Sequence, residues 1–352
     1  MRFGVEEEFC FINLKDHGLE NSIFEFLPLI PDNIRDSKVK PDLHECILEV
    51  STDVCTDLEE LEEQLISLRN TVTEKAEWLG LSLISTGIHP FSPSESATLI
   101  ETDRYIRLIE GGALLSEGVH FGMHIHIEEE LRDRMFGMIS RLKYFIPEII
   151  ALSVNSPYYL GVRTGFASSR LYRYGRTPTV GIPPNIGDYD DFERYIQKMS
   201  VYGIREGRDI YWDIRPRMRF GTVEVRVMDS QATVWQTLGV SQFILQLYRH
   251  IKRNYDGDIS ISLPTRAELY YNRYQAMRDG MEAVFQVRGG VISARERISG
   301  IAEVIKNDGF TGKKASGSLD RLIDGETGER FQIDAGDAYE ATETLSDVFL
   351  EV

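Results

Sequence analysis

The sequence predicts an α+β fold with a mostly antiparallel β-sheet, and two observations support this. Strand candidates lie mainly in the first two thirds of the 352 residues and pair mostly as hairpins, whereas helical patterns dominate afterwards. A regular alternation of strands and helices would instead predict a parallel sheet. We therefore expect a single elaborated domain over residues 1–352, with a strand-rich core over about 1–230 and a helix-rich part over about 231–352.

The charge balance restricts the partners of this chain. Lys and Arg total 39 and Asp and Glu total 56, which gives a net charge of −17. An acidic chain lacks the basic face that nucleic acid requires, and no run of about 18 apolar residues predicts a membrane span. The three cysteines and the acidic N-terminus fit a cytoplasmic protein better than a secreted one. We expect small-molecule partners and leave homo-oligomerisation open.

The first third of the chain combines strand candidates with one strong helix. Thr56 and Glu59 have the spacing of a capping box, apolar residues follow at helical spacing, and Gly80 is a suitable stop. The strands expected here are Phe3–Ile12, Leu43–Val50 and Leu81–Thr86.

The remainder contains further strands separated by a long irregular stretch. From Asn155 to Asp188 the chain is rich in Gly, Pro, Ser, Arg and Tyr, and such a stretch inside a domain is usually functional. A helix over Glu130–Val154 should break or kink at Pro147. The other expected elements are a strand over Val119–Ile127, a hairpin over Ile210–Asp229, helices from Thr233 to about Asn307 and a last helix over Ala338–Leu350.

Four glutamates on two predicted strands form the first candidate site. Residues i and i+2 of a strand point the same way, so Glu6 and Glu8 should share a face, as should Glu45 and Glu49 on the second strand. An isolated acidic run is more often a solvated surface. Four carboxylates on neighbouring strands would repel one another unless a cation joined them, and oxygen ligands suit magnesium or manganese.

Two later strands add histidines and an acid–base pair. His124 and His126 lie at i and i+2 in FGMHIHI, a pattern as consistent with ligands as with satisfied core residues. In TVEVRV, Glu224 and Arg226 also share a face. Taken alone, that pair is more often a structural ion pair, although Arg226 could equally contact a phosphate.

Arginine is strongly favoured over lysine in the middle of the chain. Between Gly161 and Ser230 there are eleven arginines and one lysine. The guanidinium matches carboxylate and phosphate oxygens in a bidentate geometry that lysine cannot offer. Several of the eleven are ordinary surface charges, and Arg170, Arg215 and Arg226 are the candidates because each lies in a compact motif. No G-x-x-x-x-G-K-[ST] loop occurs, so carboxylate-bound cations would have to hold the phosphates of a nucleotide.

Eight motifs occur in an order that resembles one known family. They are GVEEEF, HECILEVST, STGIHPF, FGMHIHI, NSPYYLG with RTGFASSR, GIPP, YWDIRP and TVEVRVMD. Together they resemble the YbdK-like carboxylate-amine ligases of the glutamate–cysteine ligase type 2 family, from residue 2 to about residue 285. NRYQAMRDG continues the likeness, and GETGERFQ (Gly325–Gln332) is similar to the family's Gly-rich, Arg-containing C-terminal motif.

The resemblance implies a glutamine synthetase/guanido kinase-like catalytic fold, in which a curved, mostly antiparallel sheet forms a funnel with helices on its outer face. It also implies an ATP-dependent ligase. ATP would phosphorylate a carboxylate, usually the γ-carboxylate of glutamate, and an amine such as that of cysteine would attack the acyl phosphate. ADP and phosphate would leave. The implied cofactors are ATP and Mg²⁺, with Mn²⁺ as a replacement.

The resemblance further implies roles for individual residues. His126 corresponds to a histidine that contacts substrate or phosphate, and Arg226 to an arginine on the transferred phosphoryl group. Arg215 is expected to contact phosphate or substrate, and Arg330 corresponds to the arginine of the C-terminal motif. Arg170, chosen from the arginine pattern, is expected to bind substrate or nucleotide. The implied metal ligands are Glu6, Glu8, Glu45, Glu49, His124 and Glu224.

Two other functions stay open on the sequence. A metal-dependent hydrolase could use the His-x-His pair, but such enzymes need further histidines, and only His250 follows His126, on a helical pattern. A non-catalytic nucleotide or amino-acid sensor could share the same fold. An intact carboxylate cluster argues against a sensor, because such a cluster is destabilising unless it binds a metal.

Overall fold

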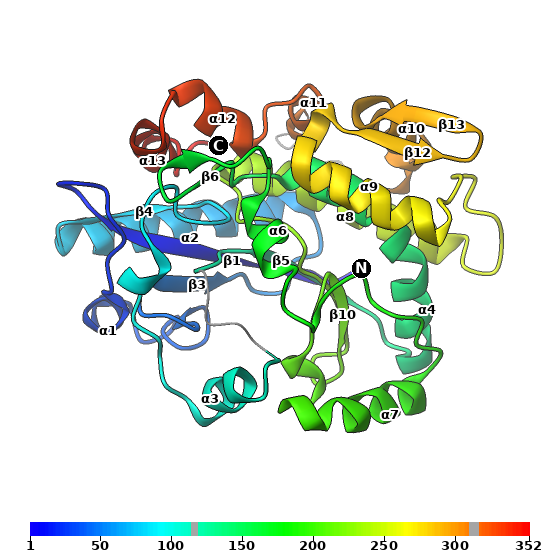
Figure 1. Ribbon diagram of the computed structural model, residues 1–352, viewed down its shortest axis with the longest axis horizontal. Helices are drawn as coiled ribbons and strands as arrows, with labels where there is room; N and C mark the ends of the chain where they lie inside the picture. Colours follow the sequence, from blue (N-terminus) through cyan, green and yellow to red (C-terminus); the bar gives the residue numbers. More distant parts are fainter. Residues whose placement is uncertain (114–118, 310–316) are drawn as a thin grey trace.

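The computed structural model describes residues 1–113, 119–309 and 317–352, and one seven-stranded sheet runs through its middle (Figure 1). Every pairing in this sheet is antiparallel, which confirms the predicted sheet type. Strand β4 (Leu81–Ile84) pairs with β1 beside the main path. In spatial order the other strands are β10 (Ile214–Arg217), β11 (Thr222–Val225), β5 (Met123–Glu128), β1 (Phe3–Asn13), β3 (Ile47–Ser51) and β2 (Val39–Pro41).

The two faces of this sheet differ in chemistry because side chains alternate along each strand. Phe3 and Val5 of β1, Ile125 of β5 and Val223 of β11 point to one face and are buried in the largest hydrophobic cluster. The intervening charged residues point to the opposite face. The helices that contribute to that cluster include α2 (Leu58–Trp78), α4 (Arg132–Leu142), α5 (Ile146–Ser153) and α8 (Val234–Arg253).

Shorter elements surround this core. In Figure 1, α12 and α13 lie on the same side of the sheet as α9, whereas α3 and α7 lie on the other side. The remaining α-helices are α1 (Ile23–Phe26), α3 (Asp103–Glu110), α6 (Ser169–Tyr174), α7 (Tyr189–Met199), α9 (Arg266–Asp279), α10 (Ala294–Ile305), α11 (Ser318–Ile323), α12 (Gly328–Ala335) and α13 (Ala338–Asp347). The small sheets pair β6 (Tyr158–Tyr159) with β7 (Val162–Arg163), β8 (Val180–Gly181) with β9 (Tyr211–Trp212), and β12 (Val284–Val287) with β13 (Gly290–Ser293).

The 3₁₀ helices are η1 (Leu27–Leu29), η2 (Ser94–Ser96), η3 (Lys143–Phe145), η4 (Ser200–Tyr202), η5 (Gly207–Asp209), η6 (Gly280–Glu282) and η7 (Lys306–Asp308). Within the described ranges, no helix is both long and apolar enough to cross a membrane.

The predicted helices are present, with corrections at their ends. The capping residue of α2 is Asp57 and not Thr56, because the Asp57 carboxylate accepts the N–H of Glu60. Gly80 follows the end of α2 at φ +72°, as its role as a stop requires. The helical stretch over 130–154 is divided by η3, and Pro147 lies in the first turn of α5, where its missing N–H costs nothing.

Other elements differ more strongly from the prediction. The hairpin β12–β13 interrupts the helical stretch expected from Thr233 to Asn307. Helices α3 and α7 were not predicted. The second predicted strand begins at Ile47, four residues later than the expected Leu43. Residues 310–316, in the Gly-rich segment, lie outside the described residues.

One buried arginine ties the sheet to the C-terminal segment. The guanidinium of Arg69 in α2 donates to Glu7 Oε1 (2.6 Å) and to the carbonyl of Phe349 (2.8 Å). It also lies 5.1 Å from the ring centre of Phe9 and 4.8 Å from that of Phe349. Glu7 belongs to β1 and points to the helix-covered side, directly behind Glu6 and Glu8. Removing either charge would leave the other unpaired in the core, at a cost of about 3–5 kcal/mol.

Candidate active site

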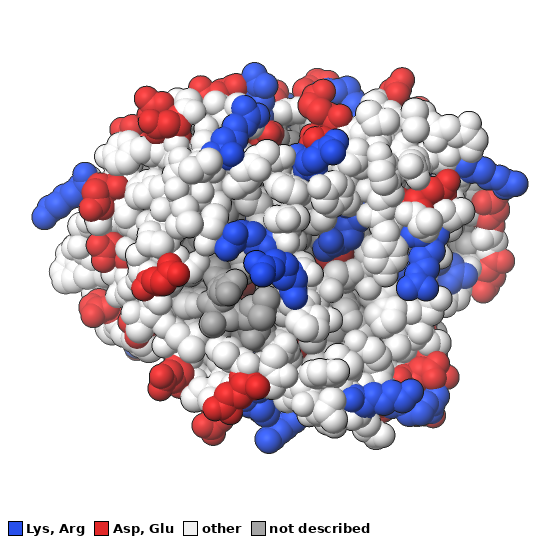
Figure 2. Space-filling view, in the orientation of Figure 1, with Lys and Arg blue, Asp and Glu red and all other residues white. Residues whose placement is uncertain are grey.

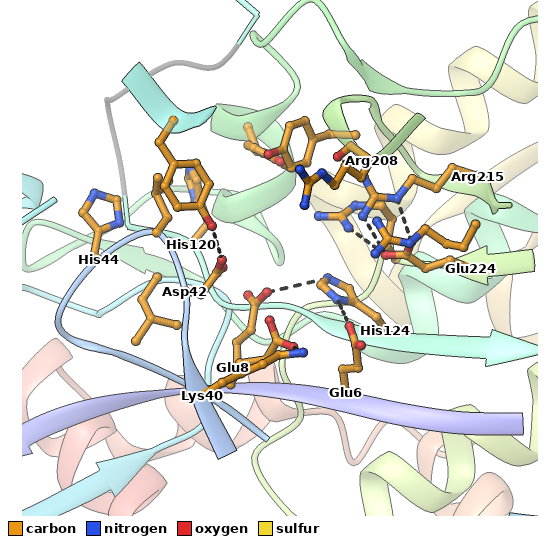
Figure 3. A pocket seen from close by; sticks show the side chains of 18 of the residues that line it. Glu6, Glu8, Lys40, Asp42, His44, His120, His124, Arg208, Arg215 and Glu224 are labelled. Carbon is orange, nitrogen blue, oxygen red and sulfur yellow. Dashed lines mark hydrogen bonds and ion pairs between the residues drawn. The ribbon is translucent and has the colours of Figure 1, made fainter. Parts of the chain in front are cut away.

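A cavity of about 270 Å³ opens on the charged face of the central sheet. Its floor comes from β1, β3, β5, β10 and β11, and α3, α6 and η5 contribute to its walls (Figure 3). The face in Figure 2 carries Lys and Arg side chains near its centre, whereas Asp and Glu side chains lie mostly towards its edge. The cavity is lined by several basic side chains although the net charge of the protein is −17; they are Lys40, Arg104, Arg170, Arg208, Arg215, Arg217 and Arg226.

Strand register brings the charged residues of the cavity side by side. Glu8 of β1 is paired with Glu49 of β3, and Glu6 of β1 is paired with His124 of β5. On the other side of β5, Glu224 of β11 is paired with both His126 and Arg215. Side chains at paired positions of antiparallel strands lie about 5 Å apart, so these residues form a continuous row across the sheet.

Three carboxylates gather at one end of this row. Oxygen atoms of Glu8, Asp42 and Glu49 all lie within 4.8 Å of one another. Burial, followed by the negative charge of Asp42, raises the pKa of Glu8 to about 8. Burial and the charge of Glu6 likewise raise the pKa of Glu49, although Lys40 Nζ lies 2.8 Å from Glu49 Oε1. Such a cluster requires protons or a cation, and its oxygen donors suit Mg²⁺ or Mn²⁺.

His124 lies between the carboxylates of β1. Its Nδ1 is 3.4 Å from Glu6 Oε2 and its Nε2 is 3.8 Å from Glu8 Oε1. Burial, followed by the positive charge of Arg226, lowers the pKa of His124 to about 4, so the imidazole is neutral at pH 7. Among the residues that the structure describes, the buried Nε2 atom has no hydrogen-bond partner. A neutral imidazole with an unsatisfied nitrogen next to carboxylates has the properties of a metal ligand.

Arginines surround Glu224 at the other end of the row. Glu224 Oε2 accepts from Arg215 Nε (2.7 Å), and Oε1 accepts from Arg226 Nη1 (2.8 Å) and Arg215 Nη2 (3.0 Å). Arg217 Nε lies 3.5 Å from Oε2. Burial opposes ionisation of Glu224, but Arg215 and Arg226 hold its pKa well below the usual value. In this arrangement Glu224 anchors the arginines, while its predicted role as a metal ligand stays a prediction.

Arg170 enters the cavity from α6, in the irregular stretch predicted to be functional. Its Nη1 donates to the carbonyl of Val227 (3.3 Å), and its buried Nε has no hydrogen-bond partner within residues 1–113, 119–309 and 317–352. Its guanidinium lies against Gly122, where a Cβ would come within 2.5 Å of Arg170 Nη2 and 3.0 Å of His124 Nε2. Gly122 therefore lets Arg170 approach the carboxylate cluster.

The cavity brings together most of the residues that the sequence predicted. Those lining it are Glu6, Glu8, Glu49, His124, Arg170, Arg215, Glu224 and Arg226. His126 lines an adjoining cavity of about 350 Å³, which shares Glu6 and Phe220 with the first. Its Nε2 lies 3.5 Å from Glu6 Oε2, and its Nδ1 lies 3.1 Å from Thr222 Oγ1.

Two predicted residues lie outside both cavities. Glu45 is in a turn before β3, so strand alternation does not place it on the same face as Glu49, and it does not line either cavity. Arg330 is on the exposed side of α12, where its Nε pairs with Asp334 Oδ2 at 2.8 Å. The structure therefore contradicts the shared face expected for Glu45 and Glu49, and it places Arg330, which the family motif suggested, away from both cavities.

Several cavity residues were not found from the sequence. Asp42 lies between β2 and β3, outside any regular alternation, and its Oδ1 accepts a hydrogen bond from Tyr105 Oη (2.8 Å). The sequence signal for Asp42 was its position seven residues before Glu49, which has meaning only once β2 and β3 are known to pair. The other lining residues missed are Lys40, Leu43, His44, Ile47, Arg104, Tyr105, His120, Tyr174, Arg208, Tyr211, Arg217 and Phe220.

Two solved structures have a shape similar to that of this chain. A glutamate–cysteine ligase from Francisella tularensis, in complex with AMP, has a TM-score of 0.72 at 13% identity and covers 100% of this chain and 89% of its own. A bifunctional glutathione synthetase from Pasteurella multocida has a TM-score of 0.66 at 12% identity and covers 99% of this chain and 52% of its own. At these identities the likeness concerns the fold, and it confirms the predicted fold class.

Sequence comparison adds a family assignment to this likeness in fold. A protein of Janthinobacterium sp. (strain Marseille) named "Putative glutamate--cysteine ligase 2" is 32% identical over 303 residues, 85% of this chain and 81% of that protein. A protein of the same name from Paraburkholderia xenovorans (strain LB400) is 34% identical over 281 residues, 79% of this chain and 75% of that protein. The model of glutamate-cysteine ligase family 2 matches residues 2–330. The chain therefore belongs to glutamate-cysteine ligase family 2 and is a ligase-like enzyme that joins a carboxylate to an amine.

Proposed function

We propose that this carboxylate-amine ligase uses ATP and divalent cations to join the γ-carboxylate of glutamate to the amine of cysteine. The observation that carries the proposal is the pairing of two opposite environments in one cavity. Carboxylates without enough counter-charge lie at one end, and buried arginines lie at the other. Phosphoryl transfer needs both, because it depends mainly on positioning and on neutralising charge.

The residues at the acidic end fit a divalent cation. Glu8, Asp42 and Glu49 offer carboxylate oxygens within 4.8 Å of one another, and the buried His124 Nε2 lacks a hydrogen-bond partner in the described part of the chain. These four residues, together with Glu6, would hold the cations. When bound, Mg²⁺ or Mn²⁺ supplies positive charge that neutralises phosphate oxygens.

The arginine end would stabilise the phosphoryl group as it moves to the carboxylate. Arg226 and Arg215 are fixed by Glu224, so no reorganisation is needed when negative charge develops nearby. In the proposed reaction the γ-carboxylate attacks the terminal phosphorus of ATP, and ADP leaves. The cysteine amine then attacks the acyl carbon and loses a proton, and phosphate leaves. Arg170 would contact an anionic group of the amino-acid substrate.

The adjoining cavity suits the base and sugar of the nucleotide. The exposed apolar side chains of Val54 and Phe220 line it, and it meets the first cavity at Glu6. A nucleotide placed there would direct its phosphates towards the carboxylates, past His126. The AMP bound to the fold neighbour from Francisella tularensis supports a nucleotide in this fold.

Initial-rate measurement of ADP release tests the proposal. The protein is incubated with ATP, Mg²⁺ and a panel of amino acids, singly and in pairs. ADP release that depends on glutamate and cysteine together, with γ-glutamylcysteine as product, supports it. Release that depends on another pair would keep the ligase chemistry and reject the substrates. Metal-dependent hydrolysis without ATP would favour a hydrolase, and nucleotide binding without turnover would favour a sensor.

A further inference from the structure

We propose that Gln332 and Gly328 of the C-terminal GETGERFQ motif are positioning residues for Arg170 and act through Asn155 and Asp229. This inference rests on the proposed function, in which Arg170 contacts an anionic group of the substrate. It also gives a role to a motif whose arginine, Arg330, points away from the cavity. Neither Gln332 nor Gly328 lines the cavity, so both would act at a distance.

The buried carboxylate of Asp229 fixes two segments within the irregular stretch, Asn155–Ser156 and the start of α6 at Ser168. Its Oδ2 accepts from Ser156 Oγ (2.8 Å) and from the N–H of Asn155 (2.8 Å), and its Oδ1 accepts from Ser168 Oγ (2.9 Å). Ser168 is the N-cap of α6 and accepts the N–H of Leu171 (3.3 Å). Asp229 therefore determines where α6 begins.

These hydrogen bonds also fix the orientation of Arg170. Its backbone N–H donates to Ser156 Oγ (3.2 Å), and its Nη1 lies 3.6 Å from Asp229 Oδ1. The side chain is 3% exposed, so it has little freedom to adopt another rotamer. A shift of Ser156 or Ser168 would change the direction from which the guanidinium meets a ligand.

Helix α12 holds the segment next to Asp229 in place. Gln332 is fully buried, and its Nε2 donates to the carbonyl (2.9 Å) and to the side-chain Oδ1 (2.8 Å) of Asn155. Asn155 Nδ2 in turn donates to the carbonyls of Ser85 (2.9 Å) and Ser230 (2.7 Å). The side-chain amide of Asn155 thus links its own segment and the segments at Ser85 and Ser230 to α12.

Gly328 permits this contact. A Cβ at position 328 would lie 2.2 Å from Asn155 Oδ1, a distance that no side chain tolerates. The next residue, Glu329, donates its N–H to the carbonyl of Val154 (3.0 Å). The first turn of α12 therefore packs directly on the residues that precede Ser156, and only glycine fits at position 328.

The test compares Gln332→Met with Arg330→Ala on the same helix. Methionine keeps the volume of Gln332 but cannot donate, so the Asn155 bonds are lost. We expect the KM for the carboxylate substrate to rise about 3- to 10-fold, the effect of one or two hydrogen bonds, with kcat changed less than about 2-fold. Arg330→Ala should leave both constants unchanged. A lower unfolding temperature with an unchanged KM would reduce Gln332 to a structural role and overturn the proposal.

A double-mutant cycle tests whether the effect passes through Arg170. In an Arg170→Lys background, Gln332→Met should raise the KM no further, because the group that it positions is already altered. Additive effects of the two substitutions on KM would contradict the inference.

A crystal structure of Gln332→Met separates this inference from the proposed function. Displacement of the Arg170 guanidinium from Gly122 and from the Val227 carbonyl supports positioning, whatever reaction the enzyme catalyses. An unmoved Arg170 overturns the inference even if glutamate and cysteine are the substrates. A displaced Arg170 in a protein that does not join glutamate to cysteine would reject only the proposed substrates.

Discussion

The two ends of the cavity use the same kinds of side chain in opposite ways. At the arginine end, each oxygen of Glu224 has a guanidinium partner within 2.8 Å. At the acidic end, Glu8, Asp42 and Glu49 share one small volume, and Lys40 balances part of their charge. The first region is electrostatically complete within the chain, whereas the second requires a partner from solution.

This difference shows that buried charge alone does not identify a ligand site. Glu224 is as buried as any carboxylate of the cluster, yet its pKa is held low, whereas the pKa of Glu8 is raised to about 8. A lowered pKa indicates that the protein has already supplied the counter-charge, and a raised one indicates that it has not. Substitutions at the two ends should therefore separate activity from stability.

The largest combined effect is expected for Glu224→Gln, which should lower both activity and stability. Loss of the carboxylate leaves Arg215 and Arg226 buried and unpaired, so the free energy of unfolding should fall by about 3–5 kcal/mol. ADP release should fall by roughly 100-fold or more as the arginines lose their positions. Denaturant unfolding and the ADP assay measure the two effects. Glu206→Gln, which removes the exposed partner of Arg208, is the matched control and should change stability by less than about 1 kcal/mol.

Glu8→Gln should abolish activity and leave the metal-free fold intact. Because the raised pKa keeps Glu8 mostly protonated near neutral pH without a cation, glutamine is a close substitute there. In the wild type, Mg²⁺ at about 100 times its Kd should stabilise the fold by roughly 2.7 kcal/mol. The variant should lose most of this gain in thermal unfolding. Equal stabilisation of both proteins by Mg²⁺ would place the cation elsewhere.

The pH dependence of metal-free stability should be smaller and should have a definite sign. The folded protein holds a proton on Glu8 up to about pH 8, whereas the unfolded chain releases it near the ordinary value of 4.5. Between these values the folded state binds more protons, so the free energy of unfolding should fall as pH rises. Denaturant unfolding at pH 5, 6.5 and 8 in chelator measures this. The decline should be weaker in Glu8→Gln, and an equally steep decline there would point to another group.

The smallest effect is expected for Glu45→Gln. Glu45 lies outside the cavity, so ADP release should stay within about 2-fold of the wild type and stability within about 0.5 kcal/mol. A loss of activity comparable with that of Glu8→Gln would restore Glu45 to the metal site and weaken the distinction between the two ends.

Strand alternation made much of the cavity predictable from the sequence. Glu6, Glu8, His124 and Glu224 each lie on a regular strand, where the i, i+2 rule determines the face. The same rule was wrong for Glu45 because β3 begins at Ile47, and a pattern of alternating letters does not reveal where a strand starts.

Strand alternation could not predict the cavity residues that lie outside regular strands. Asp42 reaches the cavity because β2 pairs with β3, and Tyr105 reaches it because α3 packs opposite Asp42. The contact between Tyr105 and Asp42 joins parts of the chain that are distant in sequence. Arg330 was assigned from a motif, but its helix presents that position to solvent and presents Gln332 to the core. Local spacing therefore predicts which residues share a face, and long-range packing decides which face meets the substrate.

The burial of Arg69 has a consequence for the integrity of the tail. The Phe349 carbonyl and ring cover this guanidinium, and its carboxylate partner, Glu7, separates Glu6 from Glu8 along β1. A proteolytic cut just before Phe349 would open a path for water to the back of that strand. The last residues should therefore resist carboxypeptidase only when β1, which carries Glu6 and Glu8, is correctly packed against Arg69.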